Sequence, residues 1–217
     1  MNAATLAGLE RRIRPFVTGS FSPHFVINQY SQGRLRFLDK LKREALDVEL
    51  VDVPAKLERV LWGITFRSPL MNAAGMDKNG EMYGLFARQG AGGYIAGTTT
   101  FNCREGNKKE DIYLPFVPLP RSFAALNFLG LPNEGDEVVA QRLKDISRVE
   151  GCPLGVSVME SPDFKGQEKL ERLVEGMKLY EKAGVDFMEM NVSCPNTSKS
   201  SMTHSLLYRS LKYIKEH

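Results

Sequence analysis

The chain has 217 residues and a formal net charge of +3, with 42% hydrophobic and 25% charged residues. This length suits one domain, or one domain with an appendage. The charge is too small to indicate a nucleic-acid-binding protein, so we expect no nucleic-acid partner. No apolar run approaches the roughly 18 residues that a membrane-spanning helix needs.

The number and spacing of the cysteines and histidines indicate the redox compartment of the protein and whether a metal site is expected. The three cysteines, Cys103, Cys152 and Cys194, are an odd number without the spacing of a disulfide framework. This pattern favours thiols in a reducing compartment, so we expect a cytoplasmic protein. Cysteine and histidine do not cluster at the spacing of metal ligands, and no metal site is predicted.

Residues 1–50 are predicted to form an N-terminal helical extension. Residues 1–46 hold eight Lys and Arg against three Asp and Glu. A short amphipathic helix with a basic face is predicted from Leu35, Phe37, Leu38, Leu41 and Leu46. Two interpretations stay open: a packing appendage with a solvated face, or a docking surface for an anionic membrane or a partner.

From Ile64 onward, short apolar segments alternate with amphipathic ones. Strands are predicted at Pro69–Ala73, Gly93–Gly97, Pro153–Val158 and Phe187–Val192. Helices are predicted at Glu81–Gln89, Glu134–Ser147 and Lys169–Ala183, and from about His204 to Lys215. Repeated βα units indicate an α/β fold with a parallel sheet. We therefore interpret residues 51–217 as the first half, about four units, of a (β/α)8 TIM barrel.

Each predicted strand ends in a polar or glycine-rich segment. These segments are Ala74–Lys78, Thr98–Thr100, Ser157 and Asn191–Thr197. In a (β/α)8 barrel, the carboxyl ends of the strands face the active site. The sequence therefore predicts a site at this end of the sheet.

Four segments carry a resemblance to a known family. Met71–Glu81, Arg104–Asn107, Ala125–Asn133 and Asn191–Thr197 occur in the order of similar segments in the dihydroorotate dehydrogenases. The resemblance implies FMN-dependent oxidation of (S)-dihydroorotate to orotate in de novo pyrimidine biosynthesis. It also implies a homodimer.

Cys194 is the predicted catalytic base. The reaction removes a proton from one carbon and a hydride from the next; the flavin takes the hydride at N5, and the protein must supply a base. None of His24, His204 and His217 follows a predicted strand, whereas Cys194 does. A thiol serves as a base once its neighbours tune it. The alternative is a small buried apolar residue, which is the commoner fate of an isolated cysteine.

The resemblance also assigns binding roles. Asn191 would contact both flavin and substrate, and the other substrate-binding residues would be Lys78, Asn127, Leu129, Gly130, Leu131, Asn196 and Thr197. The flavin would lie against residues with small or hydroxyl side chains: Ala73, Ala74, Gly75, Gly97, Thr98 and Ser157. Asparagine suits a cyclic amide because it both donates and accepts hydrogen bonds. The alternatives are turn formation and helix capping for the asparagines, tight packing for the small residues and a solvated loop for Lys78.

The subclass signals disagree, and the electron acceptor stays open. Cys194 and Asn127–Asn133 resemble the soluble class, which passes electrons to fumarate or NAD. Lys78, Gly97 and the N-terminal extension resemble the membrane-associated class, which uses a quinone. Peripheral membrane contact through residues 1–46 is therefore one expectation.

The family's barrel continues for four more strands beyond the segment that ends at His217. Those strands carry the FMN phosphate site, so we expect residues 1–217 alone to bind FMN poorly. The chain would be part of a longer protein, one of a pair of chains, or a degenerate relative. Three other functions compete: a flavoprotein acting on another cyclic amide, a non-catalytic interaction fragment, and a cysteine hydrolase, which would need a histidine partner.

Overall fold

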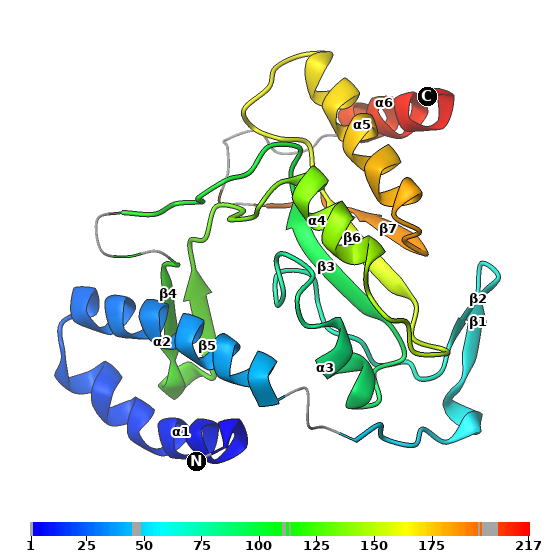
Figure 1. The fold of residues 1–217 in the computed structure, drawn as a ribbon. Coiled ribbons are helices and arrows are strands. Elements are labelled where there is room, and N and C mark those ends of the chain that lie inside the picture. Colours follow the sequence, from blue (N-terminus) through cyan, green and yellow to red (C-terminus); the bar gives the residue numbers. More distant parts are fainter. Residues whose placement is uncertain (1, 45–48, 110–111, 113, 195, 197–203) are drawn as a thin grey trace. The chain divides into compact units, whose positions relative to one another are not determined.

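The computed structural model describes residues 2–44, 49–109, 112, 114–194, 196 and 204–217 (Figure 1). The chain divides into two compact units. The first comprises Met1–Asp47 and Glu105–Gly130, and the second comprises Val48–Arg104 and Leu131–His217. No sequence pattern indicated that residues 105–130 belong with the N-terminal helices.

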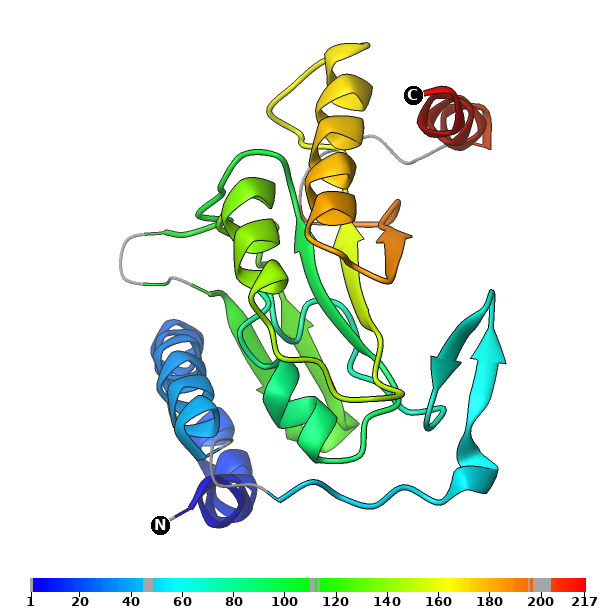
Figure 2. The ribbon, with the colours of Figure 1, turned by 45° about the vertical axis from the view of Figure 1, so that its right-hand side comes forward.

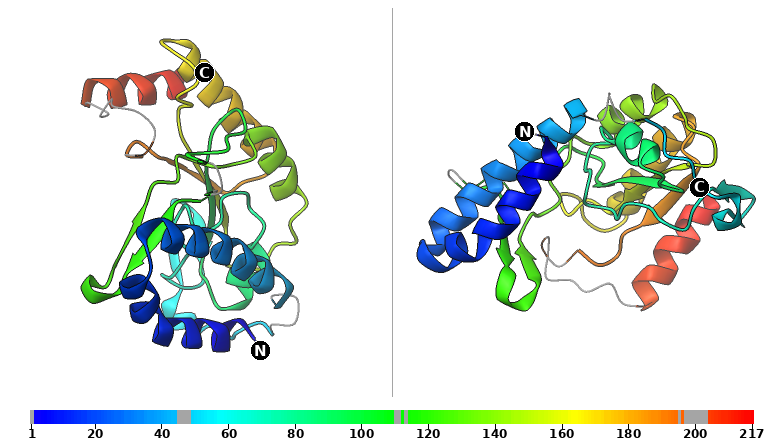
Figure 3. Two further views of the ribbon diagram at one scale, coloured as in Figure 1. Left: turned by 90° about the vertical axis from the view of Figure 1, so that its left-hand side faces the viewer. Right: turned by 90° about the horizontal axis from the view of Figure 1, so that it is seen from below.

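The first unit is a pair of helices with a β-hairpin. Helices α1 (Ala3–Ser20) and α2 (Pro23–Glu44) lie side by side, and the antiparallel hairpin of β4 (Phe116–Leu119) and β5 (Ala124–Asn127) lies beside α2 (Figure 3). A short 3-10 helix, η3 (Pro120–Ser122), joins the two strands. The predicted amphipathic helix is the second half of α2, except that Leu46 lies outside the described residues.

Polar contacts hold this first unit together. The Asn2 side chain caps α1 by accepting the Thr5 N–H at 2.8 Å. The Glu44 carboxylate accepts the Ala3 N–H at 2.8 Å, and the buried Ser31 hydroxyl accepts the Leu114 N–H at 2.8 Å. Among the described residues, no helix is both long and apolar enough to cross a membrane.

The second unit is built on a parallel sheet of three strands. Its order is β3 (Tyr94–Thr99), β6 (Leu154–Val158) and β7 (Phe187–Met190). Helices α4 (Asp136–Lys144) and α5 (Glu168–Lys182) pack side by side against one face of the sheet (Figures 1 and 2). The remaining elements are η2 (Ala55–Leu57), the hairpin β1 (Arg59–Leu61) and β2 (Ile64–Phe66), α3 (Tyr83–Arg88) and α6 (His204–Glu216).

Burial explains why these segments fold as they do. Every residue of β3 and β6 is buried, as expected for parallel strands covered on both faces. The largest fully buried side chains are Tyr83, Tyr94, Leu143, Leu154 and Tyr180. The predicted strands within 93–97, 153–158 and 187–192 and all four predicted helices are confirmed, with ends shifted by up to three residues.

A buried polar contact fastens α4 to α5. The Tyr180 hydroxyl donates to Asp136 Oδ1 at 2.9 Å and lies 2.9 Å from Thr99 Oγ1 in β3. Burial raises the pKa of the Asp136 carboxyl above its usual range. The contact satisfies a carboxyl group that would otherwise be costly to bury.

The prediction of a first strand at Pro69–Ala73 is wrong. Only Met71 in this segment makes a β-bridge, to Gly93. The Asn72 side chain takes the place of a backbone ladder: its Nδ2 donates to Ile95 O at 2.7 Å and its Oδ1 accepts the Ile95 N–H at 3.0 Å. The segment thus runs beside β3 without forming a regular strand.

Candidate active site

Polar side chains meet where β3, β6 and β7 end. Thr98 Oγ1 lies 2.9 Å from Ser157 Oγ on the neighbouring strand. The Asn191 carboxamide, just after β7, donates from Nδ2 to Thr98 Oγ1 at 2.8 Å. The parallel register brings these ends together, since Gly97 pairs with Ser157. Three residues predicted from separate strand ends therefore form one hydrogen-bonded cluster, which we call the strand-end cluster.

Asn191 is the most accessible member of the strand-end cluster. Thr98 and Ser157 are buried, whereas Asn191 is half-buried. The Asn191 backbone N–H donates to Val158 O at 2.8 Å, and its Oδ1 accepts the Ser193 N–H at 3.0 Å. Backbone and side chain are thus both fixed, which is what a residue that orients a ligand needs.

The predicted base follows within the same loop. Cys194 is half-buried and comes three residues after Asn191. Cys103 is exposed and Cys152 is buried in the core. Asn196 is half-buried, and Thr197 lies outside the described residues.

A loop from residue 73 to 80 lies against the end of β3. The Gly75 N–H donates to Gly97 O at 2.6 Å, and the Gly97 N–H donates to Asp77 O at 3.0 Å. The buried Asp77 carboxylate accepts the Met82 N–H at 2.6 Å and a hydrogen bond from the Tyr94 hydroxyl. Burial, together with this carboxylate, raises the pKa of Tyr94, so it remains a neutral donor.

The residues predicted to lie against the flavin are therefore held in place at several positions. Ala73 is exposed, Ala74 and Gly75 are half-buried, and Gly97 is buried. A Cβ built on Gly75 would lie 3.5 Å from Lys78 Nζ, so the lysine ammonium comes close to this backbone. Small side chains and a nearby cation therefore meet at one loop.

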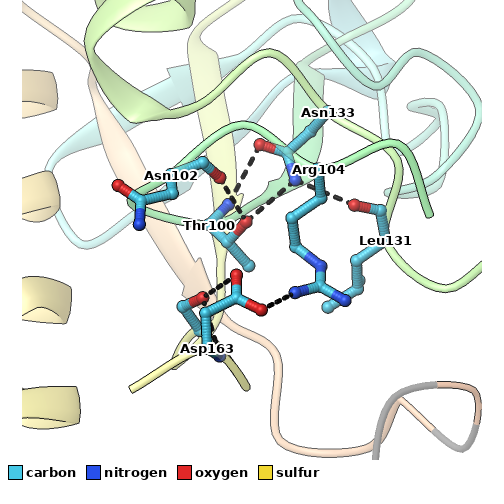
Figure 4. A network of polar contacts seen from close by, with 7 residues as sticks. Thr100, Asn102, Arg104, Leu131, Asn133 and Asp163 are labelled. Atoms are coloured by element: carbon cyan, nitrogen blue, oxygen red, sulfur yellow. Dashed lines mark hydrogen bonds and ion pairs between the residues drawn. The ribbon is translucent and has the colours of Figure 1, made fainter.

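A second polar group joins the loops that follow β3 and β6. Asn133 Nδ2 donates to Thr100 Oγ1 at 3.0 Å (Figure 4). Its Oδ1 accepts the Gly135 N–H at 2.9 Å. Arg104 forms an ion pair with Asp163, which holds the pKa of that carboxyl below its usual range. Asn133 is not the N-cap of α4: the helix begins after Gly135, and the asparagine stabilises the preceding turn.

Sequence reasoning missed Glu189. This glutamate lies opposite Ser157 in the register of β7 and β6, and its Oε1 accepts the Ser157 hydroxyl at 2.8 Å. Its local sequence carries no signal for this contact, because the partner comes from the adjacent strand. Among the described residues, no group of three His, Cys, Asp or Glu side chains is placed to hold a metal ion.

Comparison with known proteins decides the family. The family model for dihydroorotate dehydrogenase matches residues 56–207. The chain belongs to the dihydroorotate dehydrogenase family. This match confirms the family that the sequence motifs indicated.

Two curated relatives are each named dihydroorotate dehydrogenase (quinone). The relative from Crocosphaera subtropica is 33% identical over 173 residues, which cover 79% of this chain and 44% of that protein. The relative from Synechococcus sp. (strain JA-3-3Ab) is 34% identical over 143 residues, covering 66% and 36%. The chain therefore spans less than half the length of these family members.

Solved structures of the family have a fold similar to that of this chain. A crystal structure of DHODH from Eimeria tenella in complex with ferulenol has a TM-score of 0.74 and 25% identity, covering 85% of this chain and 50% of that chain. The ligand-free structure from the same organism gives a TM-score of 0.69. The predicted fold class, the first units of a TIM barrel, is confirmed.

The other residues predicted from the dihydroorotate dehydrogenase pattern lie in both units. Asn127 is exposed at the end of β5, and Leu129 and Gly130 are buried within the first unit. Gly130 has a φ of 71°, in the left-handed region that favours glycine, and a Cβ there would lie 2.5 Å from the Asn107 side chain. Leu131 begins a segment of the second unit and is buried with a positive φ of 58°, which residues other than glycine rarely adopt.

Proposed function

We propose that this chain acts in the FMN-dependent oxidation of (S)-dihydroorotate to orotate, in de novo pyrimidine biosynthesis. The observation that supports it most is the strand-end cluster of Thr98, Ser157 and Asn191, followed by Cys194 in the same loop. Membership of the dihydroorotate dehydrogenase family supports the same reaction.

The residues around the strand-end cluster fit a flavin ring. Gly75 and Gly97 lack side chains and are joined by a 2.6 Å backbone hydrogen bond, which leaves little bulk at the end of β3. The Asn191 carboxamide is neutral and both donates and accepts hydrogen bonds, as a ring with imide N–H and carbonyl groups requires, and the buried Thr98 hydroxyl holds it in place. When bound, FMN supplies a hydride acceptor at N5.

Within this chain, each side chain has a separate task. Cys194 receives the proton that dihydroorotate loses from carbon. The Asn191 carboxamide orients the ring at which the reaction occurs, and the Lys78 ammonium attracts the substrate carboxylate. Asn127, Leu129, Gly130, Leu131, Asn196 and Thr197 remain the predicted substrate contacts, and Ala73, Ala74 and Ser157 the predicted contacts of the flavin.

The electron acceptor we propose is a quinone. The curated relatives bear that acceptor in their names. The first unit supports it with exposed apolar side chains of α1, of the turn after it and of the start of α2: Leu9, Ile13, Phe16, Phe21 and Phe25. Beside the basic residues of 1–46, such side chains suit peripheral contact with an anionic membrane, where quinones reside. The homodimer and the cytoplasmic location remain predictions from sequence.

The experiment is a visible spectrum of the purified chain titrated with FMN, before and after adding dihydroorotate under nitrogen. Because FMN binding by residues 1–217 is expected to be weak, the titration is carried to high FMN concentration, where we expect flavin absorption bands on the protein and their bleaching by dihydroorotate. A chain that takes up no FMN at the highest concentration would overturn the proposal. Bleaching by another cyclic amide in a substrate panel, but not by dihydroorotate, would replace the substrate and keep the flavoprotein.

A further inference from the structure

The hydrogen bonds of the strand-end cluster continue through the sheet to Glu189. Asn191 Nδ2 contacts Thr98 Oγ1 at 2.8 Å, Thr98 Oγ1 contacts Ser157 Oγ at 2.9 Å, and Ser157 Oγ contacts Glu189 Oε1 at 2.8 Å. Four side chains on three adjacent strand ends thus form one linear chain. Thr98 and Ser157 are 3% and 0% exposed, so their hydroxyl groups depend on one another.

The direction of this chain follows from what each group can donate. A glutamate carboxylate carries no proton, so Ser157 must donate to Glu189. A hydroxyl has one hydrogen, so Ser157 then accepts from Thr98, and Thr98 accepts from Asn191. All three hydrogen bonds therefore point toward Glu189.

An independent contact agrees with this direction. The Ser193 N–H donates to Asn191 Oδ1 at 3.0 Å, which places the carboxamide nitrogen toward Thr98. With the carboxamide turned over, the amide nitrogen would face the Ser193 N–H, donor against donor. The orientation of Asn191 is thus determined from both of its sides.

We propose that Glu189 is a positioning residue, which fixes the Asn191 carboxamide by setting the direction of the Thr98 and Ser157 hydroxyls. The inference rests on the proposed flavin-dependent function and assigns this site a specificity. Among the described residues, one N–H and one lone pair of the Asn191 amide have no partner. They match a ligand edge that carries a carbonyl oxygen beside an N–H, as in an imide or cyclic amide.

Glu189 suits substitution because it is exposed, whereas the hydroxyls that it directs are buried. Glu189→Gln keeps an oxygen that accepts the Ser157 hydrogen bond and removes the charge. Glu189→Met has similar length and removes the acceptor. The same pair of substitutions at Glu171, an exposed residue of α5, gives a matched control.

The experiment measures the dissociation constant for FMN by quenching of flavin fluorescence, together with the thermal midpoint of each variant. We expect Glu189→Met to weaken FMN binding about tenfold, the effect of losing one oriented hydrogen bond, with an unchanged midpoint. Glu189→Gln should bind within about twofold of the wild type, and both Glu171 variants should match it.

The outcomes separate the inference from the function on which it rests. Equal FMN binding by all variants would overturn the role of Glu189 and leave the flavoprotein intact. Equal loss in Glu189→Gln and Glu189→Met would also overturn it, because the charge rather than the acceptor would then matter. Failure of the wild-type chain to bind FMN would overturn the proposed function, and the inference with it.

Discussion

The two units of this chain differ in their buried cores: the main hydrophobic cluster of the described residues lies in the second unit. In the second unit, Leu143, Leu154 and Val156 are fully buried, and polar groups gather where the strands end. In the first unit, Leu9, Ile13 and Phe16 on α1 are 49 to 68% exposed. The second unit gains stability from this core and contains the proposed active site. The exposed apolar side chains of α1 are those on which the proposed membrane contact of the first unit rests.

The largest effect is expected from removing the proposed base, Cys194, from the second unit. Cys194→Ala should slow the bleaching of bound flavin by dihydroorotate about 10²- to 10⁴-fold, the usual contribution of a general base. Cys103→Ala is the control, because Cys103 is exposed on a neighbouring loop of the same unit. Stopped-flow absorbance measures both rates. Equal rates for Cys194→Ala and the wild type would remove Cys194 from the mechanism.

The second test compares the same substitution in a helix of each unit. Leu143→Ala in α4 should lower the free energy of unfolding by about 2–5 kcal/mol, because it leaves a cavity beside β3. Leu9→Ala in α1 should cost less than about 1 kcal/mol, because that side chain is half in water already. Urea denaturation measures both. Similar costs would mean that α1 contributes to stability as a core helix does.

The success of prediction from sequence also differs between the units. The β3 and β6 strands were predictable because they are continuous apolar runs bounded by turns, as fully buried parallel strands are. The strand-end cluster of Thr98, Ser157 and Asn191 was predictable by the same rule, because residues that end parallel strands meet at one edge.

The features that sequence reasoning missed depend on contacts between distant residues. The β4–β5 hairpin contains Pro118, and its turn has Phe123 at a φ of 51° where glycine would have signalled the bend. Asn72 pairs with β3 through its side chain, so an apolar run was mistaken for a strand. Glu189 gains its role only from the register that sets it opposite Ser157.

A smaller effect is expected in the binding of the first unit to lipid vesicles. Phe16→Ser should weaken binding to vesicles of phosphatidylcholine and phosphatidylglycerol about tenfold, since burying a phenylalanine contributes about 1.5–3 kcal/mol. Trp62→Ser is the matched control: Trp62 is 86% exposed at the tip of the β1–β2 hairpin in the second unit. Vesicle sedimentation measures both. An equal loss with Trp62→Ser would show that membrane contact is not confined to the first unit.

The smallest effect concerns an ion pair in each unit. Arg104 hydrogen-bonds Asp163 and lowers the pKa of that carboxyl, so the stabilisation is present above the unfolded-state value of about 4 and is lost as the pH falls through the folded-state value. Asp163→Asn should therefore lower the free energy of unfolding by about 0.5 kcal/mol at pH 7, a modest value because the carboxylate is partly exposed, and by less at pH 3.

The Glu105–Lys108 pair of the first unit has a longer contact, 3.4 Å, and a glutamate whose side chain is 78% exposed. Glu105→Gln should change the free energy of unfolding by less than about 0.3 kcal/mol at either pH, because solvent screens such a pair. Urea denaturation at pH 7 and pH 3 measures both variants. If Glu105→Gln cost as much as Asp163→Asn, the link that Arg104 makes between the loops after β3 and β6 would contribute no more to stability than an ordinary surface ion pair.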